Sequence, residues 1–461
     1  MHPDVVVIGG GFAGLSAGAL LAERGVRVLV LEARGRLGGR ATAFKDRETG
    51  EIVDNGQHVM FGCYRETLAF LERIGARQNV RTQNSLEIPF IGRDRDRTLL
   101  KCPGWPAPLH LLGGILTWSA LPLRDRLSAL RLGPAIMRAR RASPAAGPPR
   151  HTSTAGEETV FDWLRAHGQT PRLIEALWEP LAVAALNQPI ADAAAAPFVR
   201  VLAEMFGTDR SAAALVLPTT PLDEMYAAPA RAFIESRGGE IRTDALARVI
   251  CDAGGPSAVD VRRQRGGGSS DAIERVVTRR VIAAVPWHAM RNLFPQPPDV
   301  VQPMLAAAGA MRSMPIVTVN LWYDDVVMDE AFVGLTGRTV QWVFDKRRVF
   351  GEASSHLSLV VSAAEALAPL SQDELVAIAA REIAEVLPAA RAARLVRATV
   401  VREKQATFSL SSGEPARPAA RTGIPGLVLA GDWIDTGLPG TIESAVLSGH
   451  RAARAMLEAE Y

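Results

Sequence analysis

The stretch Asp4–Arg40, DVVVIGGGFAGLSAGALLAERGVRVLVLEARGRLGGR, decides the fold. Its first apolar run, Val5–Ile8, predicts a parallel strand buried on both faces. The glycines of G-x-G-x-x-G follow at once, and then comes a helix that ends at Gly25. A second strand, Val26–Leu31, ends at the acidic Glu32. Together these elements predict a βαβ unit that binds a dinucleotide.

The three glycines of that motif have different roles in the predicted site. Gly9 permits the tight turn, Gly11 lets the backbone approach a pyrophosphate, and Gly14 lets the helix lie close to the sheet. Glu32 lies 18 residues after Gly14, where a carboxylate accepts hydrogen bonds from ribose hydroxyls. Four neighbours complete this part of the predicted cofactor site: Phe12, Ala13, Ala33 and Arg34.

The next segment, Gly35–Arg40 (GRLGGR), indicates which dinucleotide is bound. Gly38 and Gly39 let the main chain donate to a cofactor, and Arg40 adds a fork of donors for phosphate or flavin oxygens. The segment resembles the G-x-x-G-G-R of the flavoprotein superfamily that includes amine oxidases, protoporphyrinogen oxidase and carotenoid desaturases. The resemblance implies FAD as cofactor. It also implies an α/β fold of the amine oxidase/phytoene desaturase type, in which a Rossmann-type FAD-binding domain is interleaved with an α+β substrate domain.

The C-terminal segment LVLAGDWIDTGLPGTIESAVLSGHRAARAML (427–457) is a second strong motif. Its strand ends at Gly431 and Asp432, which presents Asp432 to the ribityl or pyrophosphate region. A helix then begins near Gly440, Thr441 and Ile442, and its free N–H groups point at the flavin edge where charge accumulates on reduction. Motifs at opposite ends of the chain that need one ligand imply that the chain returns to one FAD domain.

Between these motifs, VIAAVP (281–286) resembles the strand that rejoins the cofactor domain, with Ala247 or Val249 placed to touch adenine through the backbone. The chain holds no second G-x-G-x-x-G, which excludes a dedicated nicotinamide domain. We therefore predict an FAD-binding domain from residues 1–62, 230–295 and 420–461, and a substrate-binding domain from 63–229 and 296–419.

The polar cluster Asp54–His58 (DNGQH) lies near the expected flavin. On its residues alone it is an ordinary Asx turn. Together with WEPLAVAALN (178–187) and GDWIDTGLPGTIESA (431–445), it resembles the hydroxysqualene dehydroxylases, which convert hydroxysqualene to squalene in bacterial hopanoid synthesis. The resemblance implies a hydrophobic isoprenoid substrate, hydroxysqualene, and contact with the flavin from Asn55, Gly56, Gln57 and His58.

Reductive removal of an allylic hydroxyl needs one proton for the leaving oxygen and a hydride, which reduced flavin carries at N5, in a dry cavity. We assign the proton to His58, with Gln57 orienting it and Asp54 as the alternative donor. The reaction requires an external reductant, which the sequence does not indicate.

Two other functions stay open. A carotenoid desaturase of the phytoene type, or another amine-oxidase-like flavin oxidoreductase, would share the FAD motifs but run in the oxidative direction. A non-enzymatic lipid carrier on the same fold, as in the Rab GDP-dissociation inhibitors, would hold no flavin.

The composition excludes several classes of protein. A net charge of +3 gives no case for nucleic acid. The three cysteines, Cys63, Cys102 and Cys251, are widely separated and offer neither a disulfide framework nor a C-x-x-C metal site. We therefore predict no metal and a reducing, cytoplasmic location. The first strand begins so early that we expect no signal peptide.

The apolar stretch 103–123 (PGWPAPLHLLGGILTWSALPL) is long enough to cross a bilayer, but its four prolines and its glycine pair argue against a spanning helix. Trp105 and Trp118 suit a membrane interface. Six arginines follow: Arg124, Arg126, Arg131, Arg138, Arg140 and Arg141. Three interpretations of 103–142 stay open: a cap over a lipid tunnel, a peripheral contact with the inner face of the cytoplasmic membrane, or a plain buried helix pair.

The remaining predictions concern the substrate domain and its loops. Trp178–Phe206 is expected to be helical, with breaks at its prolines, and to wall an apolar cavity. The other predicted elements are strands over Pro315–Tyr323 and Val340–Phe350, a helix over Ser371–Leu387 opened by a capping box of Ser371 and Glu374, an exposed loop over 143–157, and a hairpin tip over 262–270.

Overall fold

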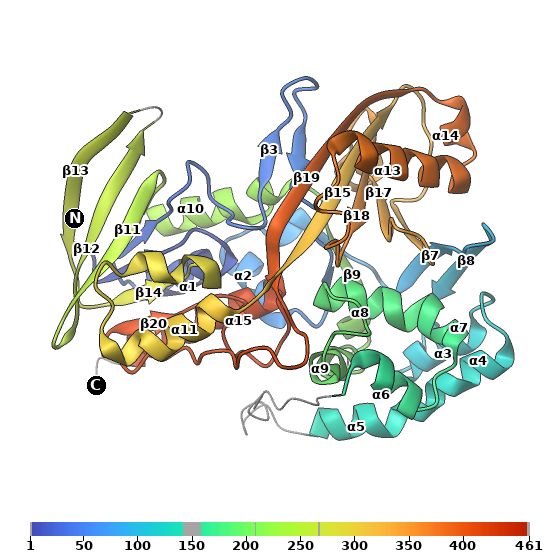
Figure 1. The fold of residues 1–461 in the computed structure, drawn as a ribbon, viewed down its shortest axis with the longest axis horizontal. Helices are drawn as coiled ribbons and strands as arrows, with labels where there is room; N and C mark the ends of the chain where they lie inside the picture. The colour runs from blue at the N-terminus through green and yellow to red at the C-terminus, as the bar shows by residue number, and fades with distance from the viewer. Residues whose placement is uncertain (1, 142–157, 208, 266–267, 459–461) are drawn as a thin grey trace.

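The computed structural model describes residues 2–141, 158–207, 209–265 and 268–458. The predicted loop 143–157, and residues 266–267 of the predicted hairpin tip, lie outside them. The described chain forms two halves, each built on one large sheet (Figure 1). We call them the parallel-sheet half, which contains β14 (Val281–Ala283) and β20 (Leu427–Leu429), and the mixed-sheet half, which contains β15 (Ser313–Tyr323) and β18 (Ser355–Val361).

The parallel sheet has the order β10-β2-β1-β14-β20, and every neighbouring pair is parallel. Its strands are β1 (Val5–Ile8), β2 (Val28–Leu31), β10 (Glu240–Arg242), β14 (Val281–Ala283) and β20 (Leu427–Leu429). Alternate residues of β1 enter two different cores: Val5 and Val7 pack under helices, whereas Val6 and Ile8 pack under an antiparallel sheet. Because both faces are covered, every position of β1 is apolar, as the sequence predicts.

Three helices cover one face: α1 (Phe12–Glu23), α10 (Ala228–Glu235) and α15 (Ile442–Glu458). The other face is covered by the sheet of β11 (Ala245–Asp252), β12 (Gly255–Arg265) and β13 (Gly268–Val277), with α11 (Gln302–Ala310) beside it. Helix α1 ends as predicted, with Gly25 at φ 77°.

The seven-stranded mixed sheet has the order β19-β15-β18-β17-β16-β7-β8. Its strands are β7 (Glu87–Ile91), β8 (Arg97–Lys101), β15 (Ser313–Tyr323), β16 (Phe332–Leu335), β17 (Trp342–Asp345), β18 (Ser355–Val361) and β19 (Leu395–Phe408). Helices α13 (Gln372–Val386) and α14 (Ala389–Ala392) cover one face. The predicted capping box of Ser371 and Glu374 is present, and the predicted strand Pro315–Tyr323 is confirmed as part of β15.

The predicted strand Val340–Phe350 is wrong beyond Asp345. There β17 ends and a short helix, α12 (Lys346–Phe350), begins. The carboxylate of Asp345 accepts the Arg347 N–H at 2.9 Å, which caps the helix, and Gly351 ends it at φ 76°.

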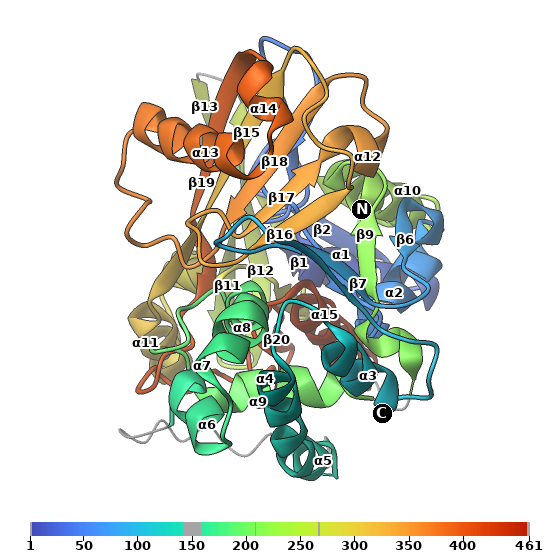
Figure 2. The same ribbon diagram turned by 90° about the vertical axis from the view of Figure 1, so that its right-hand side faces the viewer.

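The second face of the mixed sheet packs on a helical layer that lies at the bottom of Figures 1 and 2. It contains α3 (Leu109–Thr117), α4 (Leu123–Ser128), α5 (Gly133–Arg141), α6 (Val160–Ala166), α7 (Pro171–Leu173), α8 (Glu179–Leu186) and α9 (Ala195–Met205). Of the prolines expected to break Trp178–Phe206, Pro197 lies in the first turn of α9, which tolerates proline, whereas Pro180 follows a π-helical turn, Ile174–Trp178, that runs directly into α8. Within the described ranges, no helix combines the length and apolar character that crossing a membrane would need.

Residues just after the predicted first domain boundary pack with the parallel-sheet half. Helix α2 (Arg65–Arg73) buries Phe70 and Leu71 in its core, and the Glu443 carboxylate of α15 accepts the N–H of Thr67 at 2.9 Å. Two small sheets adjoin the parallel-sheet half. One pairs β3 (Ala43–Lys45) with β4 (Ile52–Asp54), and the other contains β5 (Met60–Phe61), β9 (Leu215–Pro218) and β6 (Val80–Thr82).

Candidate functional site

A cavity of about 490 Å³ lies beyond the carboxyl ends of the parallel strands, where the two halves meet. Such a volume is typical of small-molecule sites, which span roughly 300–1,000 Å³. Most of the predicted site residues line it: Gly9, Gly11, Phe12, Ala13, Glu32, Ala33, Arg34, Gly38, Gly39, Arg40, Asn55, Gly56, Gln57, His58, Ala247, Gly431, Asp432, Gly440, Thr441 and Ile442. The structure does not place Gly14, Asp54 or Val249 among the lining residues.

Glycines form the floor of this cavity, and at Gly9 and Gly14 the chain is packed too closely for a side chain. Gly9 has φ 116°, and a Cβ on Gly14 would lie 1.8 Å from the Gly9 carbonyl oxygen, so Gly14 serves helix packing as the motif predicts. A Cβ on Gly39 would lie 3.3 Å from the Cα of Gly11. At Gly11 itself a Cβ meets no protein atom closer than 3.8 Å, so a larger side chain would extend into the cavity.

Glu32 holds the end of β2 against the glycine turn. Its carboxylate accepts the N–H of Gly10 and the N–H of Arg34, each at 2.8 Å. A carboxylate has about four lone-pair sites, so acceptor capacity remains for ribose hydroxyls. Val249 is buried in the core between the two sheets, which leaves Ala247 as the predicted adenine neighbour on the cavity wall.

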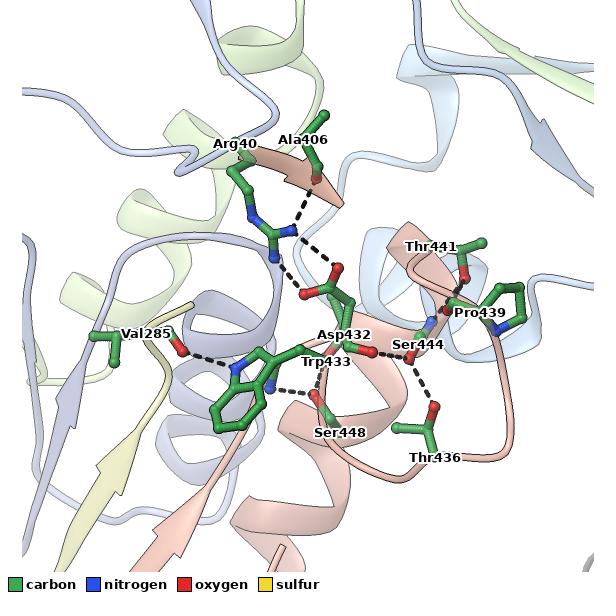
Figure 3. Close-up of polar contacts among 12 residues, drawn as sticks. Arg40, Val285, Ala406, Asp432, Trp433, Thr436, Pro439, Thr441, Ser444 and Ser448 are labelled. Carbon is green, nitrogen blue, oxygen red and sulfur yellow. Dashed lines mark hydrogen bonds and ion pairs between the residues drawn. The ribbon is translucent and has the colours of Figure 1, made fainter. Parts of the chain in front are cut away.

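We expected the Arg40 guanidinium to be free to bind a phosphate. In the structure it is bound by Asp432 instead. Figure 3 shows the bidentate ion pair, in which one nitrogen donates to Asp432 Oδ2 at 3.0 Å and also to the Ala406 carbonyl at 2.9 Å. The guanidinium also lies 5.1 Å from the centre of the Trp287 ring. This ion pair joins the two predicted motifs, which the sequence separates by almost the whole chain.

Hydroxyl groups of α15 fix the turn at Gly431 and Asp432 (Figure 3). Ser448 accepts the Gly431 N–H at 2.8 Å, and Ser444 donates to the Asp432 carbonyl at 3.0 Å. A Cβ on Gly449 would lie 2.2 Å from the Ala13 carbonyl, so α15 and α1 are in close contact. The start of α15 is thereby held at the cavity, where an α-helix favours a negative charge.

Tyr226 supports the cavity floor, and no sequence motif predicts this role. Its ring stacks on Phe12 with 3.6 Å between ring centres. Its hydroxyl lies 2.8 Å from the Gly38 carbonyl oxygen and 2.9 Å from that of Ala41, so it donates to the loop that carries the glycine pair.

The polar cluster after β4 forms a second part of the cavity wall, which we call the polar end. Gln57 and His58 line it, whereas Asp54 is only 2% exposed and lies behind them beside the buried Lys346. Burial, together with the charge of Lys346, lowers the pKa of His58 to about 4. His58 is therefore neutral at pH 7, which argues against an imidazolium as the proton donor of the free enzyme. The Nε2 atoms of Gln57 and His58 have no hydrogen-bond partner among the described residues.

Apolar side chains surround this polar end. Ala184 and Ala185 come from α8, Ile316 from β15 and Val360 from β18. The buried amide and imidazole nitrogens thus lie among mainly apolar lining residues, and leaving a buried polar group without a partner costs about 1–3 kcal/mol. This is the pattern of a site completed by a bound ligand.

Segment 103–142 is divided between interior and surface. Trp118 is 2% exposed and donates to Thr98 Oγ1 at 3.2 Å. Its side chain therefore lies in the interior and not at the membrane interface that we predicted. Arg126 donates to the backbone carbonyls of Leu116 and Leu121. Six large apolar side chains of this segment are nonetheless exposed, and we call them the apolar end: Trp105, Leu109, Leu123, Leu127, Leu130 and Met137.

A glycine-floored cavity at the ends of parallel strands, with a helix start aimed at it, defines a dinucleotide-binding α/β protein, and a second half that closes the cavity is typical of flavoproteins. The family model of flavin-containing amine oxidoreductases matches residues 12–457. The chain belongs to this family and is a flavin oxidoreductase, so the alternative of a non-enzymatic carrier is wrong.

Similar proteins agree with this assignment. The hydroxysqualene dehydroxylase of Zymomonas mobilis is 28% identical over 460 residues, which cover 97% of each chain, and the predicted resemblance is confirmed. A zeta-carotene desaturase of Arabidopsis thaliana is 24% identical over 99% of this chain and 85% of its own. An oxidoreductase of Methanosarcina mazei has the same fold, with a TM-score of 0.72 at 16% identity over 98% of this chain and 99% of its own.

Proposed function

We propose that this enzyme uses FAD to remove the hydroxyl group of hydroxysqualene reductively, giving squalene for hopanoid synthesis. The observation that carries the proposal is the pairing of unpaired buried nitrogens, on Gln57 and His58, with a mainly apolar wall in one cavity. A hydrocarbon chain with a single hydroxyl matches that surface. The full-length similarity to hydroxysqualene dehydroxylases supports the same substrate class.

The residues present fit FAD. The glycine floor leaves room for a pyrophosphate at Gly11, the Glu32 carboxylate has acceptor capacity for a ribose, and the first turn of α15 suits the flavin edge. When bound and reduced, FAD supplies the hydride that replaces the hydroxyl group. The chain's own contribution is to hold substrate and cofactor in contact and to exclude water from the apolar side.

Within this reaction, we assign hydrogen-bond donation to His58 and Gln57. Donation from these groups to the hydroxyl oxygen would weaken the C–O bond, and the oxygen would leave as water, because fully reduced FAD supplies a proton as well as the hydride. Asp54 does not line the cavity, and its contacts are with Lys346 and the Leu222 N–H. Its role is therefore to balance charge behind the wall.

The decisive experiment is a single anaerobic turnover. Purified enzyme with chemically reduced flavin is mixed with hydroxysqualene while flavin absorbance and extracted products are followed together. We expect the flavin to reoxidise and squalene to appear in equal amounts. Reduced enzyme that ignores hydroxysqualene would contradict the proposal.

A carotenoid desaturase is the second candidate, and the zeta-carotene desaturase at 24% identity favours it. It differs in the direction of electron flow, because a desaturase takes electrons from a polyene. Oxidised enzyme that bleaches with phytoene, together with inert reduced enzyme, would establish this function instead.

We also propose that the apolar end contacts the inner face of the cytoplasmic membrane, where an isoprenoid substrate would dissolve. The six exposed apolar side chains lie on or beside α3, α4 and α5, which are neighbours at the bottom of Figure 2. Exposed Arg124, Arg131 and Arg138 stand among them and would attract anionic lipid.

A further inference from the structure

A buried lysine lies directly behind the polar end of the cavity. Lys346 is 1% exposed, and its Nζ lies 2.6 Å from Gln57 Oε1, 3.5 Å from Asp54 Oδ2 and 4.1 Å from the centre of the Phe350 ring. Lysine is almost never fully buried without a partner, so these contacts explain how it is tolerated.

The contact with Lys346 decides how the Gln57 carboxamide is turned. An ammonium group has three donors and no acceptor, so only the oxygen of the amide can face it. The amide nitrogen must therefore point away from Lys346. Gln57 Nε2 is buried on the cavity wall and has no partner among the described residues. Its two N–H groups consequently lack an acceptor among the described residues, although Gln57 lines the cavity.

Asp54 makes the buried charge tolerable but does not reach the cavity. One of its oxygens accepts the Leu222 N–H at 3.0 Å and the other faces Lys346. Burial lowers the pKa of Lys346, and attraction to the Asp54 carboxylate opposes that shift. Asp54 and Gln57 thus have different roles: Asp54 compensates the charge, and Gln57 is oriented by it.

The end of β17 at Asp345 produces this arrangement. Because α12 begins at once, Lys346 turns into the protein while the next two residues, Arg347 and Arg348, retain exposed side-chain surface. Only the first residue of the sequence Lys-Arg-Arg is thereby placed in the core.

We propose that Lys346 is a positioning residue that locks the Gln57 carboxamide with its N–H groups directed into the cavity, where they bind an acceptor atom. This inference rests on the proposed function for the identity of the acceptor, which is either an edge atom of the flavin or the hydroxyl oxygen of the substrate. Each of these atoms is a hydrogen-bond acceptor.

The test is a cycle of two changes in the FAD-loaded enzyme. Lys346→Met with Asp54→Asn removes the buried charges together, so that neither is left unpaired, and Gln57→Leu removes the donor. Each change is measured alone and in combination. The readouts are FAD content, thermal unfolding, the flavin absorption spectrum and midpoint potential, and kcat and KM with hydroxysqualene.

If Lys346 acts through Gln57, each change alone lowers kcat/KM about tenfold, or lowers the midpoint potential, and the combination has no further effect. A shift of spectrum and potential without substrate assigns the acceptor to the flavin. An effect confined to kcat and KM assigns it to the substrate. Independent effects that multiply in the combination would overturn the proposal, because Lys346 would then act without Gln57.

Gln57→Leu keeps the Lys346–Asp54 pair, so it tests the donor even if the charge-removing variant does not fold. Wild-type potential and kinetics in that variant would overturn the inference. The potential is measured without turnover. If wild-type enzyme fails to convert hydroxysqualene, only the proposed function fails, and the inference is decided by whether the spectrum and potential change.

Discussion

The two ends of the cavity are built in different ways. At the dinucleotide end, backbone groups and small residues from short motifs do most of the work, as Gly9, Gly11 and Gly39 illustrate. At the polar end, side chains from separate segments meet: Gln57 follows β4, Lys346 is the first residue of α12, and Ile316 lies on β15. Backbone recognition leaves a local pattern in a sequence, whereas a site assembled from distant side chains does not.

The largest expected effect tests the dinucleotide end. Gly11→Val places a branched side chain at the cavity, where its Cβ would lie in ordinary van der Waals contact, 3.8 Å from Gly38 and Gly39, and the Gly11 backbone, at φ −89°, suits valine. We expect FAD affinity to fall by about 100-fold or more with little change in the apoprotein fold. Flavin content after purification measures it.

The matched control for that variant is Gly133→Val, at a position where a Cβ meets no atom within 4 Å and which lies outside the cavity lining. It should keep its flavin. Full flavin content in the Gly11 variant would show that the cofactor does not approach the glycine turn.

The contrast also explains how much could be predicted. The βαβ unit follows from Val5–Ile8, whose apolar character at every position reports burial on both faces. The strand predicted over 340–350 ends early because one side chain, Asp345, caps a helix. The burial of Lys346 could not be foreseen, because it depends on Asp54, which is 292 residues away and becomes a neighbour only in the folded chain. The role of Tyr226 could not be predicted for the same reason.

A second variant tests the long-range ion pair between Arg40 and Asp432 at the dinucleotide end. Asp432→Ala leaves the Arg40 guanidinium without its carboxylate partner. Because a quarter of the Arg40 side chain is exposed, we expect a loss of about 2 kcal/mol in unfolding free energy, less than for a fully buried pair. Asp432→Asn keeps the shape and one acceptor and should lose less. Urea unfolding measures both, and equal stability of all three proteins would mean that the pair only guides FAD binding.

The pH dependence of the reaction rate tests the role of His58 at the polar end. A group with a pKa of about 4 is protonated in roughly one molecule in a thousand at pH 7, and that fraction rises tenfold for each pH unit of acidification. A rate carried by the imidazolium would rise in the same way. We expect instead a flat rate between about pH 6 and 8, and about a tenfold loss in His58→Ala, because the neutral ring donates a hydrogen bond. A tenfold rise per pH unit, abolished in His58→Ala, would restore His58 as the acid.

The smallest expected effect concerns the apolar end of segment 103–142, which the reaction in the cavity does not need. Leu123 and Leu127 are 62% and 46% exposed, whereas Ile115 of the same segment 103–142 is buried and would report on folding if it were changed. Leu123→Glu with Leu127→Glu should reduce pelleting with anionic vesicles several-fold, since two inserted side chains are lost and negative charge is added. Ile273→Glu with Val277→Glu, on the exposed strand β13, adds the same charge far from α4 and should leave pelleting unchanged. Turnover of detergent-dispersed substrate should match wild type in both variants. Equal loss of pelleting in the two variants would show that net charge alone governs binding, and the apolar end would then have no special role.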